Sequence, residues 1–268
     1  MVNDFLASMA LSSKLRVMES LKEVPEEALA ISCLKYHPVP LSQKKTLKII
    51  AEIKKRSPAD GLLANENFDI KIQSTKYINA NVAAISVLTE PDAFYGSLND
   101  LAKVSVLAKK NNIPTLRKDF IIDVYQLYEA RQYGASGVLL IVKILSDELL
   151  LLLITKALSL KLFLLIECFD EQDINRLKTI LNNYESRLNH EQILLGINCR
   201  NLTTLKVNKD HFQQMSTYLF GGYSWIAESG IADASDLKQI IKYGYGGALI
   251  GSALMKAVDP SIFTNIDH

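Results

Sequence analysis

The sequence has little cysteine, almost no net charge and no long apolar run. Its 268 residues include three cysteines without a CxxC pair or a metal-type spacing, namely Cys33, Cys168 and Cys199. This usage excludes a disulfide framework and carries no metal-site signature. The formal net charge is +1, so no long-range field favours nucleic acid or an anionic membrane. The apolar stretch at 149–154 is too short to span a bilayer.

The N-terminus also lacks an export signal. The stretch MVNDFLASMALSSKLRVMESL carries Asp4 early and has no small-residue cleavage site after a long apolar core, so we interpret it as an amphipathic helix. Together with the odd cysteine count, this predicts a cytoplasmic protein in a reducing compartment. We expect no nucleic-acid partner and no membrane partner.

The sequence does contain a regular alternation of strand-like and helix-like segments from residue 46 onwards. Apolar residues make up 49% and charged residues 22% of the chain, which is typical of a globular protein. The predicted strands are 47–54, 83–89, 114–119, 137–142, 162–168, 194–199, 224–228 and 247–251. Helical patterns lie between them, for example at 97–110, 123–133, 146–158, 170–180 and 233–243.

Continuous apolar strands bounded by helices indicate a parallel sheet covered on its faces. Eight such units fit one α/β domain, a closed (β/α)₈ TIM barrel, and the chain length is normal for that fold. A doubly wound open sheet is the rival, but it usually carries a Gly-rich phosphate turn after its first strand. Here the first strand runs into KKRSPADG instead. We therefore predict an N-terminal helical extension over residues 1–45, packed on a catalytic barrel over residues 46–268.

Charged and polar side chains stand at the carboxyl ends of the predicted strands. Because strand side chains alternate, residues two apart, such as Glu52 and Lys54, share a face. In a barrel the catalytic groups come from several strands at this rim, so these side chains could meet in one bowl. The set is Glu52, Lys54, Lys118, Glu167, Asn198, Arg200 and Glu228.

Glu52 is the most informative of these residues, because it lies within its apolar run and not after it. A charged strand-end residue is ordinarily a solvated rim residue or half of an ion pair. A buried Glu52 needs a partner, for which Lys54 or Lys118 is available, and such a pairing shifts pKa values as acid–base catalysis requires. By the same alternation Lys55 faces away from the interior, and we predict it to be only a surface residue.

Histidine and metal chemistry are not indicated. None of the four histidines ends a predicted strand. Carboxylates alone could hold a metal ion, but the neighbouring lysines and arginine would repel it. Cys168 and Cys199 do end strands, and the favoured interpretation is that they are small buried residues.

Two glycine-containing turns follow the last two predicted strands. They are AESGIAD at 227–233 and LIGSAL at 249–254, the second of which places Gly251 and Ser252 before a short helix. Barrels often hold a phosphate in these two loops, with backbone N–H groups and a helix N-terminus as donors. The alternative is that both glycines simply close tight turns.

These motifs resemble the indole-3-glycerol phosphate synthase family of tryptophan biosynthesis. The specific ones are AEIKKRSP, RKDF and INCRNL, and they are accompanied by AAISVLTEPDAFYGSLNDL, LLIECFDEQD, AESGI and ALIGSALMKAVDP. They run in the family's order from about residue 46 to about residue 260. The first 45 residues match the family poorly.

The resemblance implies a phosphosugar substrate, 1-(2-carboxyphenylamino)-1-deoxyribulose 5-phosphate. It implies ring closure with loss of CO₂ and water, giving indole-3-glycerol phosphate, so the chain would be a carbon–carbon lyase that needs no cofactor and no metal. Lys118 looks like the family's general acid toward the ketone oxygen. Glu167 and Lys54 look like the acid and base of dehydration, with Glu52 setting their protonation. By the same resemblance, Asn198 and Glu228 would complete the catalytic set by orienting the substrate hydroxyls and the lysine network.

The resemblance also implies which residues bind the substrate. Arg200 and Ser57 would hold the aryl carboxylate, and apolar side chains would pack the anthranilate ring. The implied substrate-binding residues are Ser57, Phe94, Phe120, Leu139, Ile141, Arg200 and Ser229. The implied phosphate-binding residues are Gly230, Gly251 and Ser252.

Two other hypotheses remain open. The first keeps the barrel and the phosphate site but uses Lys118 as a Schiff-base nucleophile in an aldolase-type reaction. The second is a phosphosugar-binding or interaction barrel without chemistry, although such a protein has no need to keep buried charges. On assembly, we expect a monomer that makes transient contact with other enzymes of the tryptophan pathway.

Overall fold

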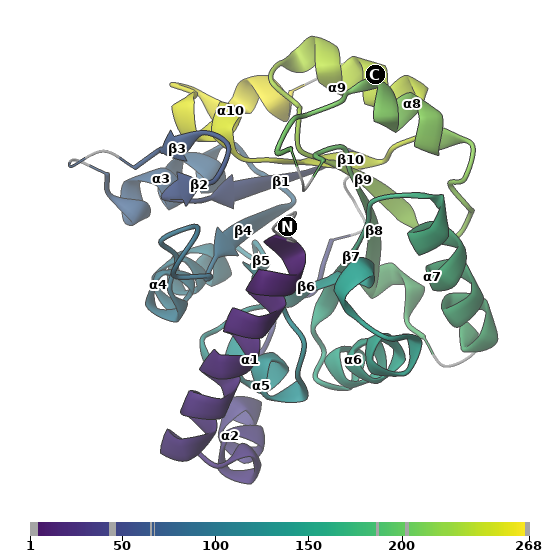
Figure 1. The fold of residues 1–268 in the computed structure, drawn as a ribbon. Coiled ribbons are helices and arrows are strands. Elements are labelled where there is room, and N and C mark those ends of the chain that lie inside the picture. The colour runs from purple at the N-terminus through teal and green to yellow at the C-terminus, as the bar shows by residue number, and fades with distance from the viewer. Residues whose placement is uncertain are drawn as a thin grey trace.

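Eight parallel strands form a closed barrel. The computed structural model describes residues 5–42, 47–64, 66, 68–185, 188–201 and 204–265. Within them the strands pair in the order β1-β10-β9-β8-β7-β6-β5-β4 and close on each other, which confirms the predicted (β/α)₈ fold (Figure 1). The strands are β1 (Lys48–Ile53), β4 (Ala84–Leu88), β5 (Thr115–Lys118), β6 (Gly137–Ile141), β7 (Phe163–Cys168), β8 (Ile193–Asn198), β9 (Ser224–Glu228) and β10 (Gly247–Ile250).

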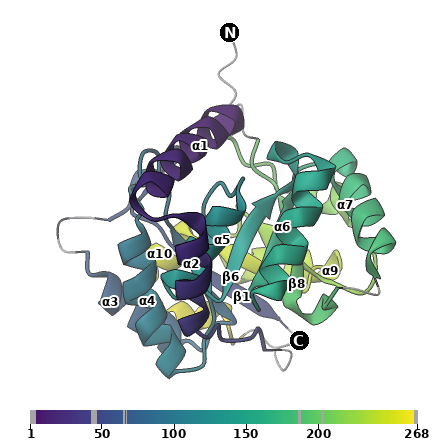
Figure 2. The same ribbon diagram turned by 90° about the horizontal axis from the view of Figure 1, so that it is seen from below.

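The helices that follow the strands form a ring outside the barrel (Figure 1; Figure 2). They are α3 (Ile70–Asn79), α4 (Leu98–Lys110), α5 (Val124–Gln132), α6 (Asp147–Ser159), α7 (Glu171–Asn183), α8 (Asp210–Ser216), α9 (Ala234–Lys242) and α10 (Ser252–Lys256). The five helical patterns named between the predicted strands correspond to α4, α5, α6, α7 and α9, and the short helix predicted after Gly251 corresponds to α10. Each of the first five begins after a Ser or Asp whose side chain accepts a backbone N–H, which satisfies donors that have no intrahelical partner.

Helices α3 and α8 are not among the predicted helices, and α7 runs past its predicted end at residue 180. The buried face of α3 consists of Gln73, Ser74 and Tyr77, and α8 buries only Phe212. Neither helix therefore shows the apolar repeat on which a prediction from sequence depends.

Apolar side chains fill the barrel interior below the carboxyl ends of the strands. Gly137 and Phe163 lie opposite each other in the β6–β7 register. A Cβ at residue 137 would overlap the Phe163 ring, so the glycine makes room for that ring in the interior. The interior cluster contains Ile50, Ala84, Leu116, Phe163, Leu165, Leu194, Ile226 and Leu249.

The N-terminal segment covers both ends of the barrel. It consists of α1 (Phe5–Glu23), α2 (Glu26–Ser32) and the 3₁₀ turn η1 (Cys33–Lys35), and α1 runs across one end of the barrel (Figure 1; Figure 2). Leu6 of α1 packs with the interior cluster. So does Leu41, whose backbone N–H donates to Gln192 just before β8. The predicted boundary between residues 45 and 46 lies outside the described residues.

The three cysteines are buried and form no disulfide, as expected of small core residues. In the part of the chain that the structure describes, no helix combines the length and the apolarity that a membrane crossing requires.

Candidate active site

The carboxyl ends of the strands surround a cavity of about 530 Å³. Every residue predicted for the site lines it: Glu52, Lys54, Ser57, Phe94, Lys118, Phe120, Leu139, Ile141, Glu167, Asn198, Arg200, Glu228, Ser229, Gly230, Gly251 and Ser252. The fold therefore brings the whole predicted set together. The chemical role of each residue stays a prediction.

Lys118 lies between two buried carboxylates. Its Nζ is 3.8 Å from Glu167 Oε2 and 4.0 Å from Glu52 Oε2. The other oxygen of Glu52, Oε1, is 3.1 Å from Lys54 Nζ. Both lysines that the sequence offers as partners for Glu52 are thus in contact with it. Charged side chains at the carboxyl ends of β1, β5 and β7 therefore form one continuous network.

These contacts shift the pKa values of Lys118 and Glu52 in opposite directions. Burial alone would lower the pKa of Lys118, but Glu167 and Glu52 outweigh it and raise the pKa to about 12. Burial alone would raise the pKa of Glu52, but Lys54 and Lys118 outweigh it and hold the pKa below its ordinary value. At neutral pH Lys118 is therefore a protonated donor and Glu52 is a charged acceptor.

Glu167 and Glu228 form a second group of carboxyls beside Lys118. Asn198 Nδ2 donates to Glu167 Oε1 at 3.1 Å, and Asn198 lies opposite Glu228 in the β8–β9 register. Burial and the nearby charge of Glu167 raise the pKa of Glu228 well above its ordinary value. Gly196 makes room for this carboxyl, because a Cβ there would overlap Glu228 Oε1.

Alternation at the end of β1 separates its neighbouring cations. Ile53 packs in the outer core under the helices, whereas Lys54, one residue beyond β1, lines the cavity. Lys55 does not line the cavity, but it is more than a surface residue. Its Nζ is 2.6 Å from Asp100 Oδ2 in the first turn of α4, and Asp100 is buried. That part of the prediction is wrong because the partner comes from a helix distant in the sequence.

Aromatic side chains form one wall of the cavity. The ring centroids of Phe94 and Phe120 are 6.4 Å apart, and Phe5 of α1 meets Phe120 edge-on at 6.0 Å. Phe169, just after β7, also lines the cavity. Phe5 and Phe169 are not among the predicted site residues. No local pattern places α1, and with it Phe5, over the cavity.

Two turns after β9 and β10 form another side of the cavity. Ser229 and Gly230 both have left-handed backbone, with φ of +70° and +73°, a conformation that is uncommon for serine. Gly251 precedes α10, whose first N–H groups have no intrahelical partner. A Cβ at Gly251 would overlap Glu52 Oε1 and lie 2.8 Å from Lys54 Nζ. Gly251 therefore also makes room for the Glu52–Lys54 pair.

Asp60 lines the cavity but is not among the predicted residues. It lies between β2 (Arg56–Ser57) and β3 (Gly61–Leu62), which pair as a hairpin. Its Oδ2 accepts from Ser252 Oγ at 2.7 Å and from Ser57 Oγ at 3.2 Å, and it is 4.0 Å from Lys54 Nζ. A carboxylate thus lies beside two residues predicted to bind anionic groups. Only the fold brings residues 60 and 252 together.

Arg200, Lys209 and Lys256 add positive charge to the cavity lining. Arg200 Nη1 donates to Leu205 O at 3.0 Å, and Lys209 Nζ binds Asp236 at 2.6 Å. The two lysines are not predicted site residues, because they stand on helix ends and not at strand ends.

The fold and the site together define a (β/α)₈ barrel with a buried cluster of lysines and carboxylates at its carboxyl rim. Sequence comparison narrows this class. The family model described as "Indole-3-glycerol phosphate synthase" matches residues 8–265. The chain belongs to this family.

Individual relatives agree with the family match. The chain is 40% identical over 216 residues to the indole-3-glycerol phosphate synthase of Campylobacter fetus subsp. fetus, covering 81% of this chain and 78% of that protein. It is 36% identical over 247 residues to the protein of the same name from Leuconostoc mesenteroides subsp. mesenteroides, covering 91% and 89%.

Solved structures share the fold at low identity. Orotidine 5'-phosphate decarboxylase from Pyrococcus horikoshii matches with a TM-score of 0.55 and 12% identity, covering 80% of this chain and 93% of that chain. Triosephosphate isomerase from Bartonella henselae matches with a TM-score of 0.51 and 14% identity, covering 81% and 98%. At this identity the likeness concerns the barrel and not the chemistry.

Proposed function

We propose that the chain converts 1-(2-carboxyphenylamino)-1-deoxyribulose 5-phosphate to indole-3-glycerol phosphate in tryptophan biosynthesis. The reaction comprises ring closure, decarboxylation and dehydration, so the chain is a carboxy-lyase. The observation that carries the proposal is the position of Lys118 between Glu52 and Glu167. They line a cavity that also has an aromatic wall and glycine turns after β9 and β10. Relatives named for this activity match most of the chain.

Ring closure and decarboxylation come first. A ring carbon of the anthranilate attacks the ketone carbon, and negative charge develops on the ketone oxygen. Lys118, protonated at neutral pH, donates its proton to that oxygen. When CO₂ leaves, the cyclised iminium takes the electron pair, so the reaction proceeds without an electron-sink cofactor.

Dehydration then requires an acid for the leaving hydroxyl and a base for a ring proton. Glu167 and Lys54 supply this pair, and Glu52 holds Lys54 in place through a contact of 3.1 Å. Asn198, which donates to Glu167, and Glu228 orient the substrate hydroxyls and the lysine network.

The remaining residues bind the substrate. Arg200 and Ser57 hold the aryl carboxylate. The apolar side chains pack the anthranilate ring, and the tilted rings of Phe94 and Phe120, with centroids 6.4 Å apart, line that part of the cavity. The substrate phosphate is held by Gly230, Gly251 and Ser252, with Ser229 at the same turn.

Incubation of the purified protein with this substrate tests the proposal. We expect indole absorbance and fluorescence to grow as CO₂ is released. Absence of product at saturating substrate would contradict the proposal, and binding by calorimetry without turnover would favour a barrel that only binds a phosphosugar.

Borohydride trapping separates the synthase from an aldolase. A Schiff base on Lys118 would leave a reduced covalent adduct after incubation with a sugar phosphate, and the adduct would appear as added mass on that lysine. We expect none, because Lys118 is held protonated and only the neutral amine attacks a carbonyl. A trapped adduct on Lys118 would contradict the synthase mechanism and favour the aldolase-type reaction.

We also propose that residues 1–45 form an extension packed on a catalytic barrel of residues 46–268. The Tyr125 hydroxyl of α5 supports this packing, since it lies 3.1 Å from both Ser20 O and Val24 O. We expect a cytoplasmic monomer that contacts other enzymes of the pathway only transiently. Light scattering coupled to gel filtration checks the monomer, and a stable dimer mass would contradict it.

A further inference from the structure

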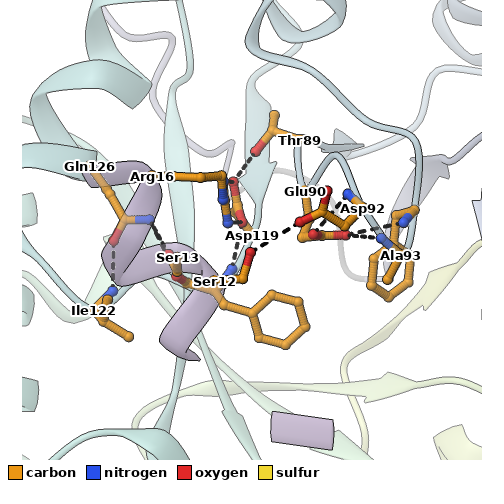
Figure 3. Close-up of polar contacts among 12 residues, drawn as sticks. Ser12, Ser13, Arg16, Thr89, Glu90, Asp92, Ala93, Asp119, Ile122 and Gln126 are labelled. Carbon is orange, nitrogen blue, oxygen red and sulfur yellow. Dashed lines mark hydrogen bonds and ion pairs between the residues drawn. The ribbon is translucent and has the colours of Figure 1, made fainter. Parts of the chain in front are cut away.

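We propose that Arg16 of helix α1 is a positioning residue for the reaction, acting through Asp119 on the backbone that carries Lys118. The assay of this idea rests on the proposed function. Arg16 Nη1 is 3.1 Å from Asp119 Oδ2 and Arg16 Nη2 is 2.8 Å from Asp119 Oδ1, which is a bidentate contact (Figure 3). Arg16 is not part of the described cavity lining, so any effect on chemistry passes through its partner.

Asp119 is a fully buried acceptor with several donors. Besides Arg16, its carboxylate accepts from Thr89 Oγ1 at 2.6 Å, from Arg117 Nη2 at 3.2 Å and from the backbone N–H of Phe120 at 2.9 Å. Burial alone would raise the pKa of Asp119, but the two arginines outweigh it and hold the pKa far below its ordinary value. The carboxylate therefore stays charged at neutral pH, and its orientation is over-determined.

Asp119 and the residues on either side of it all line the cavity. Lys118 precedes it and Phe120 follows it. The backbone carbonyl of Lys118 accepts from the Thr89 N–H at 3.1 Å. Thr89 thus binds the end of β5 twice, through this backbone contact and through its hydroxyl to Asp119. Lys118 Nζ is 3.8 Å from Glu167 Oε2, and a displacement of about 1 Å in a catalytic group can cost about 10²-fold in rate.

Ser13, one helical turn before Arg16, holds the other side of the same loop. Its Oγ donates to Phe120 O at 2.5 Å and accepts from Gln126 Nε2 at 2.8 Å. Gln126 in turn accepts from the backbone N–H of Ile122 at 2.8 Å (Figure 3). Positions three apart share a helix face, so α1 grips the loop after β5 at two points.

The same helix also reaches the loop after β4. Ser12 Oγ donates to Asp92 Oδ2 at 3.1 Å, and the buried Glu90 carboxylate accepts the backbone N–H groups of Asp92, Ala93 and Phe94 (Figure 3). The loops after β4 and β5 present the Phe94 and Phe120 rings, and Lys118 ends β5 directly before the second of these loops. Helix α1 therefore contacts both loops and fixes them relative to each other. Its one ion pair with the loop after β5, among the described residues, is that of Arg16 with Asp119.

The test compares Arg16→Met with the control Arg176→Met. Arg176 also contacts an aspartate, with Nε 2.9 Å and Nη2 2.7 Å from Asp147 Oδ1, but it lies away from the described cavity lining. We expect Arg16→Met to lower kcat by about tenfold or more while KM changes by less than about threefold. Arg176→Met keeps both values. Asp119 retains its other donors in Arg16→Met, so the variant folds.

Three further measurements separate positioning from general weakening. Added to Asp119→Asn, Arg16→Met lowers kcat by no more than about twofold, because Arg16 works through that carboxylate. In the single variant Arg16→Met, the basic limb of the kcat–pH profile moves to lower pH, because Lys118 moves away from the carboxylates that raise its pKa. For the same reason, labelling of Lys118 by an amine reagent at alkaline pH, read by mass spectrometry, becomes faster.

Wild-type kcat with unchanged labelling in Arg16→Met would overturn the proposal, as would full additivity with Asp119→Asn or an equal loss in Arg176→Met. If Arg16→Met does not fold, Arg16→Lys, which keeps the charge but loses the bidentate geometry, decides by the same measurements. Turnover by the wild type tests the proposed function, whereas Lys118 labelling needs no turnover. The two failures are therefore distinguishable.

Discussion

The lower and upper parts of the barrel interior bury different kinds of side chain. The lower part is apolar and includes Phe163 of β7, which is fully buried. Glu167 stands further along the same strand, at the rim, with Glu228 and Lys118 beside it. Burial of a large apolar side chain stabilises the fold by about 1.5–3 kcal/mol, whereas buried ion pairs often contribute nothing net. The lower interior therefore holds the fold together, and the rim keeps charges that the proposed reaction needs.

Removal of Lys118 has the largest expected effect and is confined to the rim. We expect Lys118→Ala to lower kcat by about 10³-fold or more, because the proposed general acid is lost. The variant still folds, because Glu52 keeps Lys54 and Glu167 keeps Asn198. Product formation and circular dichroism check both parts.

The matched control for this change is Lys55→Ala. Lys55 binds Asp100 and lies outside the described cavity lining, so kcat stays within about twofold of wild type. A Lys118→Ala variant with a near-wild-type rate would show that the general acid is another group.

Truncation in the lower interior should give the reverse pattern. We expect Phe163→Ala to lower the free energy of unfolding by about 3–5 kcal/mol, because it leaves a cavity over Gly137. Below the melting transition kcat changes little. Guanidinium denaturation and the substrate assay measure the two quantities, and Phe163→Leu serves if the alanine variant is insoluble. A loss of kcat without a loss of stability would mean that this layer also positions the rim.

The variant Glu228→Gln tests whether buried charges at the rim lower the free energy of unfolding. The folded-state pKa of Glu228 lies above the ordinary value of 4.5, so rising pH ionises the unfolded chain first and stability falls with pH above that value. Glu228→Gln escapes this loss. We expect it to be more stable than wild type by on the order of 1 kcal/mol at neutral pH, with the difference vanishing at acidic pH. Thermal melts of both proteins across pH measure this, and a difference that does not depend on pH would contradict it.

Asp60 should have the smallest effect, on binding alone. Its carboxylate contacts Ser252 and lies 4.0 Å from Lys54 Nζ, where it competes with an anionic group of the substrate. We expect Asp60→Ala to lower KM by about two- to fivefold with little change in kcat. The effect should shrink at high salt. If KM rises instead, the Asp60 contact holds the hairpin in a productive position.

The elements of the fold were largely predictable, because their signals are local. Every strand of the barrel lies within its predicted range except β8, which begins at Ile193, one residue earlier. The two short hairpin strands β2 and β3 were not predicted. Helices α4 and α5 start directly after Ser97 and Asp123, which cap them. Helix α3 was not predictable, since its buried positions are mostly polar.

For the candidate site, the lining residues were predictable but many of their contacts were not. Strand parity and the rule that barrel chemistry lies at the carboxyl rim were enough to select residues such as Glu52 and Glu167. Their partners were not all predictable. Asp60 and Ser252 lie far apart in the sequence, as do Arg16 and Asp119, and no periodicity relates such positions.

Local chemistry along the chain was therefore sufficient to say which side chains enter the barrel, where helices start and that lysines and carboxylates gather at one end. Those properties follow from alternation and capping, which act over a few residues. Closure of the sheet established the rest. Because β1 pairs with β10, Gly251 lies against Glu52 and Lys54, and the mutual neutralisation of buried charges depends on such contacts across strands. Helix α1 reaches Asp119 only after the barrel has closed beneath it.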